Sequence, residues 1–138
     1  MLQPPKVLLL ICDEAEKGIL QEILSPYAEM TSVCDTREME EVLNASSYDV
    51  LFCAWSLCSG GWNEALEEVR QRHPYLPVII LSRTADERRW LQVLEAGAFD
   101  LLAPPYYERA VLSVLEHAVA SHDARMWQHA GRLKENVG

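Results

Sequence analysis

Short apolar runs alternate along the chain with longer stretches in which apolar residues recur every three or four positions. The apolar runs are Val7–Ile11, Met30–Cys34, Val50–Trp55, Val78–Leu81 and Phe99–Ala103. The first, third and fourth are almost continuously apolar, which is typical of strands buried on both faces of a parallel sheet. The pattern therefore predicts five strands that are covered by helices.

The stretches between these runs have helical spacing. Leu20, Ile23 and Leu24 form one apolar stripe, and similar stripes follow each later run. Asp35 stands where a helix cap is expected, and Gly97 stands where a helix should end. Five strand–helix units with right-handed crossovers place helices on both faces of one sheet. We therefore predict an α/β fold of the (βα)5 type, with a doubly wound five-stranded parallel sheet.

Composition narrows the classes of function. The chain has 138 residues, 49% of them hydrophobic and 24% charged, as expected for one globular domain. Its net charge of −9 repels phosphate backbones and anionic lipids, so we expect no nucleic-acid binding through this domain and no membrane binding. No apolar run approaches the roughly 20 residues that span a bilayer, and the first residues do not resemble a signal peptide. We expect a cytoplasmic protein.

Four segments resemble the receiver domain of two-component response regulators. They are residues 6–14, 48–52, 76–82 and 95–106, and the last carries the strongest signal, the string E-A-G-A-x-D-x-L-x-x-P. The resemblance spans about residues 6–120. It implies a flavodoxin-like fold and a role in phosphorelay signalling, with the functional residues at the carboxyl ends of the strands.

The resemblance also implies a specific chemistry. A receiver needs a phosphoacceptor aspartate at the end of the third strand, an acidic pair that holds Mg²⁺, a Ser or Thr, and a lysine. The cation and the lysine offset the charge of the phosphoryl group. At the matching positions this chain has Cys12 and Asp13 for the acidic pair, Ala54 for the acceptor, Ser82 for the hydroxyl and Pro104 for the lysine.

These substitutions predict a degenerate receiver, or pseudo-receiver, with a vestigial phosphorylation pocket. The stretch from Val50 to Asn63 has no Asp or Glu, so a shifted alignment does not restore an acceptor. We interpret Asp13 as a helix cap, with residual metal binding as the alternative, and we expect Ser82 to accept a local backbone hydrogen bond. We predict no catalytic residue, no cofactor and no bound Mg²⁺.

Cysteine and histidine spacing points to no further site. The cysteines at positions 12, 34, 53 and 58 form no CxxC pair, so we expect free thiols. The four histidines are too scattered for a metal cluster, and the three on the last helix (His117, His122 and His129) are expected to face solvent.

Residues 1–120 are expected to form the receiver-like domain, and residues 121–138 a helical extension or linker. Val119, Met126 and Leu133 recur every seven residues, which fits either a dimerising or signalling helix or a helix packed on the domain. Trp127 favours an interface. Further residues of interface-rich types follow the fourth and fifth strands: Arg88, Arg89, Trp90, Tyr106 and Tyr107.

The predicted function is a non-enzymatic signalling module that lacks the phosphoacceptor and acts through a protein partner or an attached output module, with a homodimer as one form of partner. One alternative is regulation by a ligand, a metal or thiol oxidation at the eroded pocket. A further alternative is a small flavodoxin-like enzyme, although no nucleophile–base pair is evident.

Overall fold

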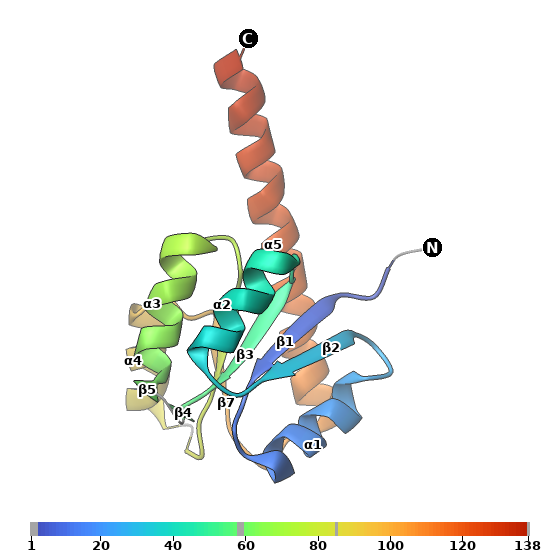
Figure 1. The fold of residues 1–138 in the computed structure, drawn as a ribbon, viewed down its shortest axis with the longest axis vertical. Helices are drawn as coiled ribbons and strands as arrows, with labels where there is room; N and C mark the ends of the chain where they lie inside the picture. Colours follow the sequence, from blue (N-terminus) through green and yellow to red (C-terminus); the bar gives the residue numbers. More distant parts are fainter. Residues whose placement is uncertain (1–2, 58–59, 85, 138) are drawn as a thin grey trace.

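A computed structural model of the chain describes residues 3–57, 60–84 and 86–137, with side chains described as far as Met126 in the last helix. Five parallel strands form one sheet in the order β2-β1-β3-β6-β7 (Figure 1). The strands are β1 (Lys6–Leu10), β2 (Glu29–Val33), β3 (Val50–Ala54), β6 (Val78–Leu81) and β7 (Asp100–Leu102). The sheet has the predicted number of strands and the predicted parallel arrangement, which confirms the fold class.

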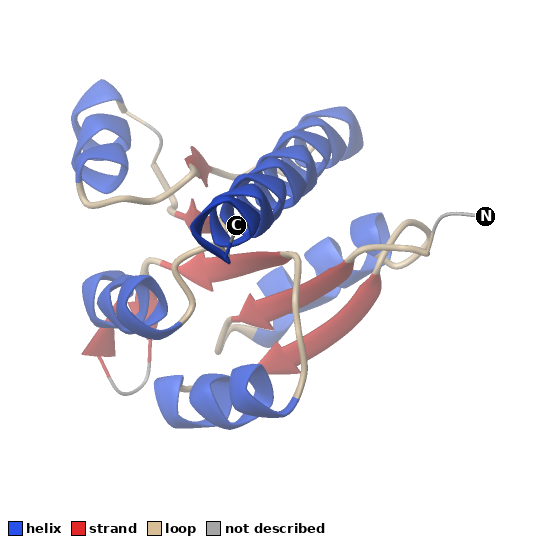
Figure 2. Ribbon diagram, turned by 90° about the horizontal axis from the view of Figure 1, so that it is seen from above, coloured by secondary structure: helices blue, strands red, loops and turns tan. Residues whose placement is uncertain are grey.

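Helices cover both faces of this sheet (Figure 2). They are α1 (Glu14–Leu24), α2 (Thr36–Ala45), α3 (Trp62–Arg72), α4 (Glu87–Glu95) and α5 (Glu108–Val137). Residues from α2, α3 and α4 share one buried cluster with alternate strand residues such as Leu8 and Leu51. Residues from α1 and α5 share a second cluster with the intervening strand residues, such as Leu9 and Phe52. The continuous apolar runs therefore reflect strands that are buried on both faces.

The loop after β3 contains structure that the sequence pattern does not predict. Strands β4 (Ser56–Leu57) and β5 (Gly60–Gly61) pair antiparallel as a short hairpin. Gly61 then precedes α3 as its N-cap residue. The backbone N–H of Trp55 donates to the carbonyl of Leu81 at 2.8 Å, so the chain stays beside β6 before it turns into the hairpin. This hairpin shapes one wall of the site described below.

Helix α5 projects well beyond the sheet (Figure 1). It runs without a break across residue 120, so the division into a domain and an extension stays a prediction. Met126 is 45% exposed, whereas the side chains of Trp127 and Leu133 lie outside the described residues. Across the described part of the chain, no helix combines the length and apolar character required to cross a bilayer.

One expectation about α5 is wrong. His117 faces solvent as predicted, but His122 does not, because its side chain is only 17% exposed and its Nδ1 lies 3.4 Å from Oδ1 of Asp49. Asp49 immediately precedes β3, at the amino end of the sheet. Helical periodicity showed which residues share a face of α5, but not that this face still contacts the domain at position 122.

Candidate functional site at the carboxyl ends of the strands

A pocket of about 470 Å³ opens where β1, β3 and β6 end. Its walls come from the segments that follow these strands and from the first turns of α1 and α4. The lining residues are Ile11, Cys12, Asp13, Glu16, Ala54, Trp55, Ser56, Leu81, Arg83, Thr84 and Arg89. Cys12, Asp13 and Ala54 therefore come together as the sequence predicted, at the edge where open α/β sheets bind ligands.

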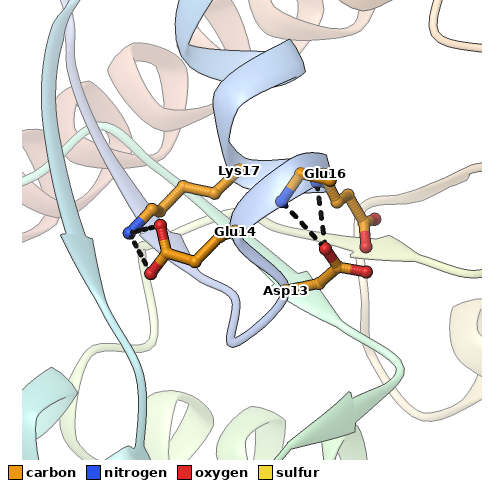
Figure 3. A network of polar contacts seen from close by, with 5 residues as sticks. Asp13, Glu14, Glu16 and Lys17 are labelled. Atoms are coloured by element: carbon orange, nitrogen blue, oxygen red, sulfur yellow. Dashed lines mark hydrogen bonds and ion pairs between the residues drawn. The ribbon is translucent and has the colours of Figure 1, made fainter.

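Asp13 caps helix α1. Its Oδ1 accepts hydrogen bonds from the backbone N–H groups of Ala15 at 2.9 Å and Glu16 at 3.3 Å (Figure 3). The negative charge lies at the positive end of the helix dipole, which adds to the stabilisation. Beside it, the Cys12 thiol donates to the backbone carbonyl of Cys34 at 2.8 Å. The capping interpretation of Asp13 is confirmed.

Ala54 is the last residue of β3 and is 7% exposed, with only a methyl group to offer the pocket. The next residue, Trp55, supplies an aromatic wall. Its ring centroid lies 5.1 Å from that of Trp62, the first residue of α3. Ala54 and Trp55 therefore give this part of the pocket an apolar and aromatic lining.

Ser82 and Arg89 connect β6 to α4. Ser82 is 2% exposed, and its Oγ accepts from Nη1 of Arg89 at 2.9 Å and from the backbone N–H of Thr84 at 3.4 Å. The predicted hydrogen bond from a local backbone N–H to Ser82 is thus confirmed. The hydrogen bond from Arg89 was not predicted from the sequence. The Arg89 guanidinium also lies over the Trp55 ring, 4.7 Å from its centroid. This arginine therefore brings a fixed positive charge to the pocket from α4.

Glu16 and Tyr106 connect α1 with the chain after β7. The Tyr106 hydroxyl donates to Oε1 of Glu16 at 2.6 Å. Burial, and then this hydrogen bond, raises the pKa of Tyr106 well above its usual range. Tyr106 is half-buried and contacts its own domain through this bond, whereas Tyr107 beside it is 67% exposed.

Of the predicted pocket residues, only Cys12, Asp13 and Ala54 line the cavity. Ser82 is buried next to it, and Pro104 is exposed and lies outside it. Arg88 and Trp90 are exposed on α4, and the Trp90 indole N–H donates to Oδ1 of Asp100 at 3.2 Å. Sequence reasoning placed Arg89 with these surface residues, but its guanidinium contacts Ser82 and Trp55. Whether these residues contact a partner stays a prediction.

A five-stranded doubly wound domain with its pocket at the carboxyl edge defines the general class of flavodoxin-like proteins. The narrower assignment comes from the sequence. The family model for the response regulator receiver domain matches residues 10–116, which is most of the chain. The chain belongs to the response regulator receiver domain family.

Curated relatives share this part of the chain. The chain is 29% identical over 85 residues to the DNA-binding transcriptional regulator NtrC of Escherichia coli K12. The aligned region covers 62% of this chain and 18% of NtrC. The chain is 28% identical over 99 residues to the response regulator protein PilR of Pseudomonas aeruginosa, covering 70% of this chain and 22% of PilR. The matched region therefore spans about a fifth of the length of these relatives.

Solved structures share the fold. A receiver domain of an HD domain-containing protein from Pseudomonas fluorescens Pf-5 superposes with a TM-score of 0.79 at 21% identity, covering 88% of this chain and 99% of that one. NtrX from Brucella abortus, in complex with ATP, superposes with a TM-score of 0.84 at 18% identity, covering 92% of this chain and 29% of NtrX. At these identities the likeness concerns the fold alone.

The residues around the pocket do not fit the Mg²⁺ ion that the resemblance implies. Mg²⁺ requires oxygen ligands in near-octahedral geometry. Here Cys12 offers sulfur and Ala54 offers no ligand atom. The two lining carboxylates already accept hydrogen bonds, Asp13 from two backbone N–H groups and Glu16 from the Tyr106 hydroxyl. Arg83 and Arg89 line the same pocket and repel a divalent cation.

Proposed function

We propose that this chain is a receiver-family signalling module that works without aspartyl phosphorylation and acts by contact with a protein. The observation that supports this most directly is Ala54 at the end of β3, lining the pocket where the resemblance implies a carboxylate nucleophile. A methyl group cannot attack a phosphoryl donor. The proposed role is therefore non-enzymatic.

The polar groups around Ala54 support the same proposal. The Ser82 hydroxyl, which the resemblance would direct at a phosphoryl group, already accepts from Arg89 and from Thr84. Two carboxylates remain at the pocket, but Asp13 is used in the helix cap and Glu16 accepts from Tyr106. In the proposed function, contacts within the protein replace those that a phosphoryl group would make.

Partner contact is proposed for the exposed surface formed by α4 and the chain after β7. Trp90 and Tyr107 are 43% and 67% exposed there, and Arg88 is exposed on the same helix as Trp90. Arginine and aromatic side chains are enriched in protein interfaces. The relatives NtrC and PilR are transcriptional and response regulators, so we propose an output module or a signalling protein as the partner.

Phosphorylation is tested by incubating the protein with Mg²⁺ and acetyl phosphate and measuring intact mass. We expect no stable adduct on the wild-type chain. Ala54→Asp is the matched variant, because it restores the carboxylate but leaves Cys12 and Pro104 in place. A phosphoryl adduct on the wild-type protein, mapped by peptide analysis to Asp13, Glu16 or another acid, would contradict the proposal.

The homodimer form of the proposal has a separate test. Light scattering of the full chain is compared with that of a chain ending at Ser121. A dimeric mass for the full chain and a monomeric mass for the shorter one would assign self-association to the later part of α5. Monomeric masses for both would favour a different protein as the partner.

A further inference from the structure

Three potential metal ligands meet at the opposite end of the sheet from the pocket. Asp49 precedes β3, and His122 and Asp123 lie on α5 as it passes the amino ends of the strands (Figure 1). One ligand atom from each residue lies within 4.8 Å of the other two. The residues come from segments more than seventy positions apart, so tertiary folding alone brings them together.

The distances suit a small tetrahedral cation. Nδ1 of His122 lies 3.4 Å from Oδ1 of Asp49 and 3.7 Å from Oδ1 of Asp123. In a tetrahedral site with metal–ligand bonds near 2.1 Å, neighbouring ligand atoms lie about 3.4 Å apart. The two distances from the imidazole nitrogen therefore match or lie close to the edge of such a site, and the two carboxylates lie within 4.8 Å of each other. A fourth ligand position would be left for water.

The buried Nδ1 of His122 lies at ion-pair distance from the two carboxylates but makes no hydrogen bond to any described residue. A buried polar atom without a partner is costly, so its persistence needs an explanation. Coordination to a cation between the two carboxylates would satisfy it.

Asp49 is held in the required orientation. Its Oδ2 accepts from the backbone N–H of Lys6 at 2.8 Å, which leaves Oδ1 directed at His122. The Lys6 ammonium is directed elsewhere, donating to Ser46 Oγ at 2.7 Å and lying 5.5 Å from the centroid of the Tyr48 ring. A hydrogen bond that fixes a ligating carboxylate is the usual support of a metal site.

We propose that Asp49, His122 and Asp123 form a site for a divalent transition metal of the zinc class, which fastens helix α5 to the amino end of the sheet. The imidazole nitrogen favours Zn²⁺ over Mg²⁺ or Ca²⁺, which prefer all-oxygen ligation. The site is independent of the proposed function, since it shares no residue with the pocket at the carboxyl edge.

The test uses tag-free full-length protein, stripped with chelator and titrated with Co²⁺, whose visible absorption reports coordination geometry. We expect one equivalent of Co²⁺ to give a tetrahedral spectrum without the near-ultraviolet bands of thiolate ligation, and Zn²⁺ to displace it. His122→Ala and Asp49→Asn are each expected to weaken binding at least about tenfold.

His117→Ala is the matched control, because His117 is exposed on the same helix and outside the cluster. It should bind Co²⁺ as the wild-type protein does. Circular dichroism checks that each variant is folded, and His122→Gln provides a second variant of similar size. An absence of saturable Co²⁺ binding by the wild-type protein would overturn the proposal, as would unchanged binding by folded His122 and Asp49 variants.

Discussion

The guanidinium of Arg89 donates to the hydroxyl of Ser82 at 2.9 Å, which joins the first turns of α4 to the residue that follows β6. The same guanidinium lies over the ring of Trp55. One side chain thus connects two of the three strand ends that surround the pocket. The position of the Arg89 side chain is the main difference between the site predicted from the sequence and the site in the structure.

Replacing Arg89 should therefore destabilise the domain. Arg89→Ala removes a charge-assisted hydrogen bond and a cation–π contact, and because Arg89 is partly exposed we expect the free energy of unfolding to fall by about 1–2 kcal/mol. Arg88→Ala, which changes an exposed neighbour, should alter it by less than about 0.5 kcal/mol. Urea denaturation measures both, and equal effects would contradict the structural role of Arg89.

The cap formed by Asp13 makes a different prediction. Asp13→Ala should lower the free energy of unfolding by about 1 kcal/mol, because two backbone N–H groups lose their acceptor. Asp13→Asn should retain most of this stability, since asparagine caps helices equally well. Thermal or urea unfolding, measured in Mg²⁺ and in chelator, distinguishes helix capping by Asp13 from metal binding by Asp13. If Mg²⁺ stabilised the wild-type protein and not Asp13→Asn, Asp13 would be a metal ligand.

Replacing a glycine by alanine should have opposite effects on stability at two positions. Gly97 follows α4 with φ +107°, and an added Cβ would lie 2.9 Å from the Arg70 guanidinium, which donates to the Ala96 carbonyl. Gly97→Ala should destabilise the protein by roughly 1 kcal/mol or more. Gly18, inside α1, has no atom within 4 Å of a Cβ position, so Gly18→Ala should stabilise it by about 0.5–1 kcal/mol. The urea midpoints of unfolding of the two variants, compared with that of the wild-type protein, test both predictions.

Alkaline pH should weaken the fold through Cys53. Burial raises the pKa of the Cys53 thiol from an ordinary 9.0 to about 12. Because the folded pKa is the higher one, this contribution to stability is fully present below pH 9 and is lost as pH rises toward 12. The loss approaches roughly 1.4 kcal/mol per pH unit in that window.

Cys53→Ala tests this dependence. The variant will be less stable at neutral pH, because it removes a fully buried side chain. Its stability should nevertheless fall less steeply between pH 9 and about 12 than that of the wild-type protein. Other groups titrate in both proteins and cancel in the comparison. Parallel slopes for the two proteins would show that Cys53 does not titrate in this range.

Much of the fold follows from local patterns. Val50–Ala54 is continuously apolar because the strand is buried on both faces, and that property is readable from the sequence. Asp13 and Asp35 precede helices, where a short acidic side chain satisfies free N–H groups, and both act as caps in the structure. The short β4–β5 hairpin was not predictable, since two-residue strands leave almost no periodicity.

In the candidate site too, some residues could be placed from the sequence and others could not. The resemblance and the position of ligand sites at strand ends predict that Cys12, Asp13 and Ala54 lie together. They did not place Arg89, because its contact with Ser82 depends on how the first turns of α4 lie over the end of β6.

The sequence by itself determined the strand–helix order, the helix caps and the absence of a carboxylate at Ala54, because these depend on residue type and local spacing. Only the tertiary structure decided which side chains from distant segments meet. It brought Arg89 to Ser82 and Trp55 at one end of the sheet, and His122 to Asp49 at the other. Such contacts depend on the relative positions of packed helices and strands, which sequence periodicity does not specify.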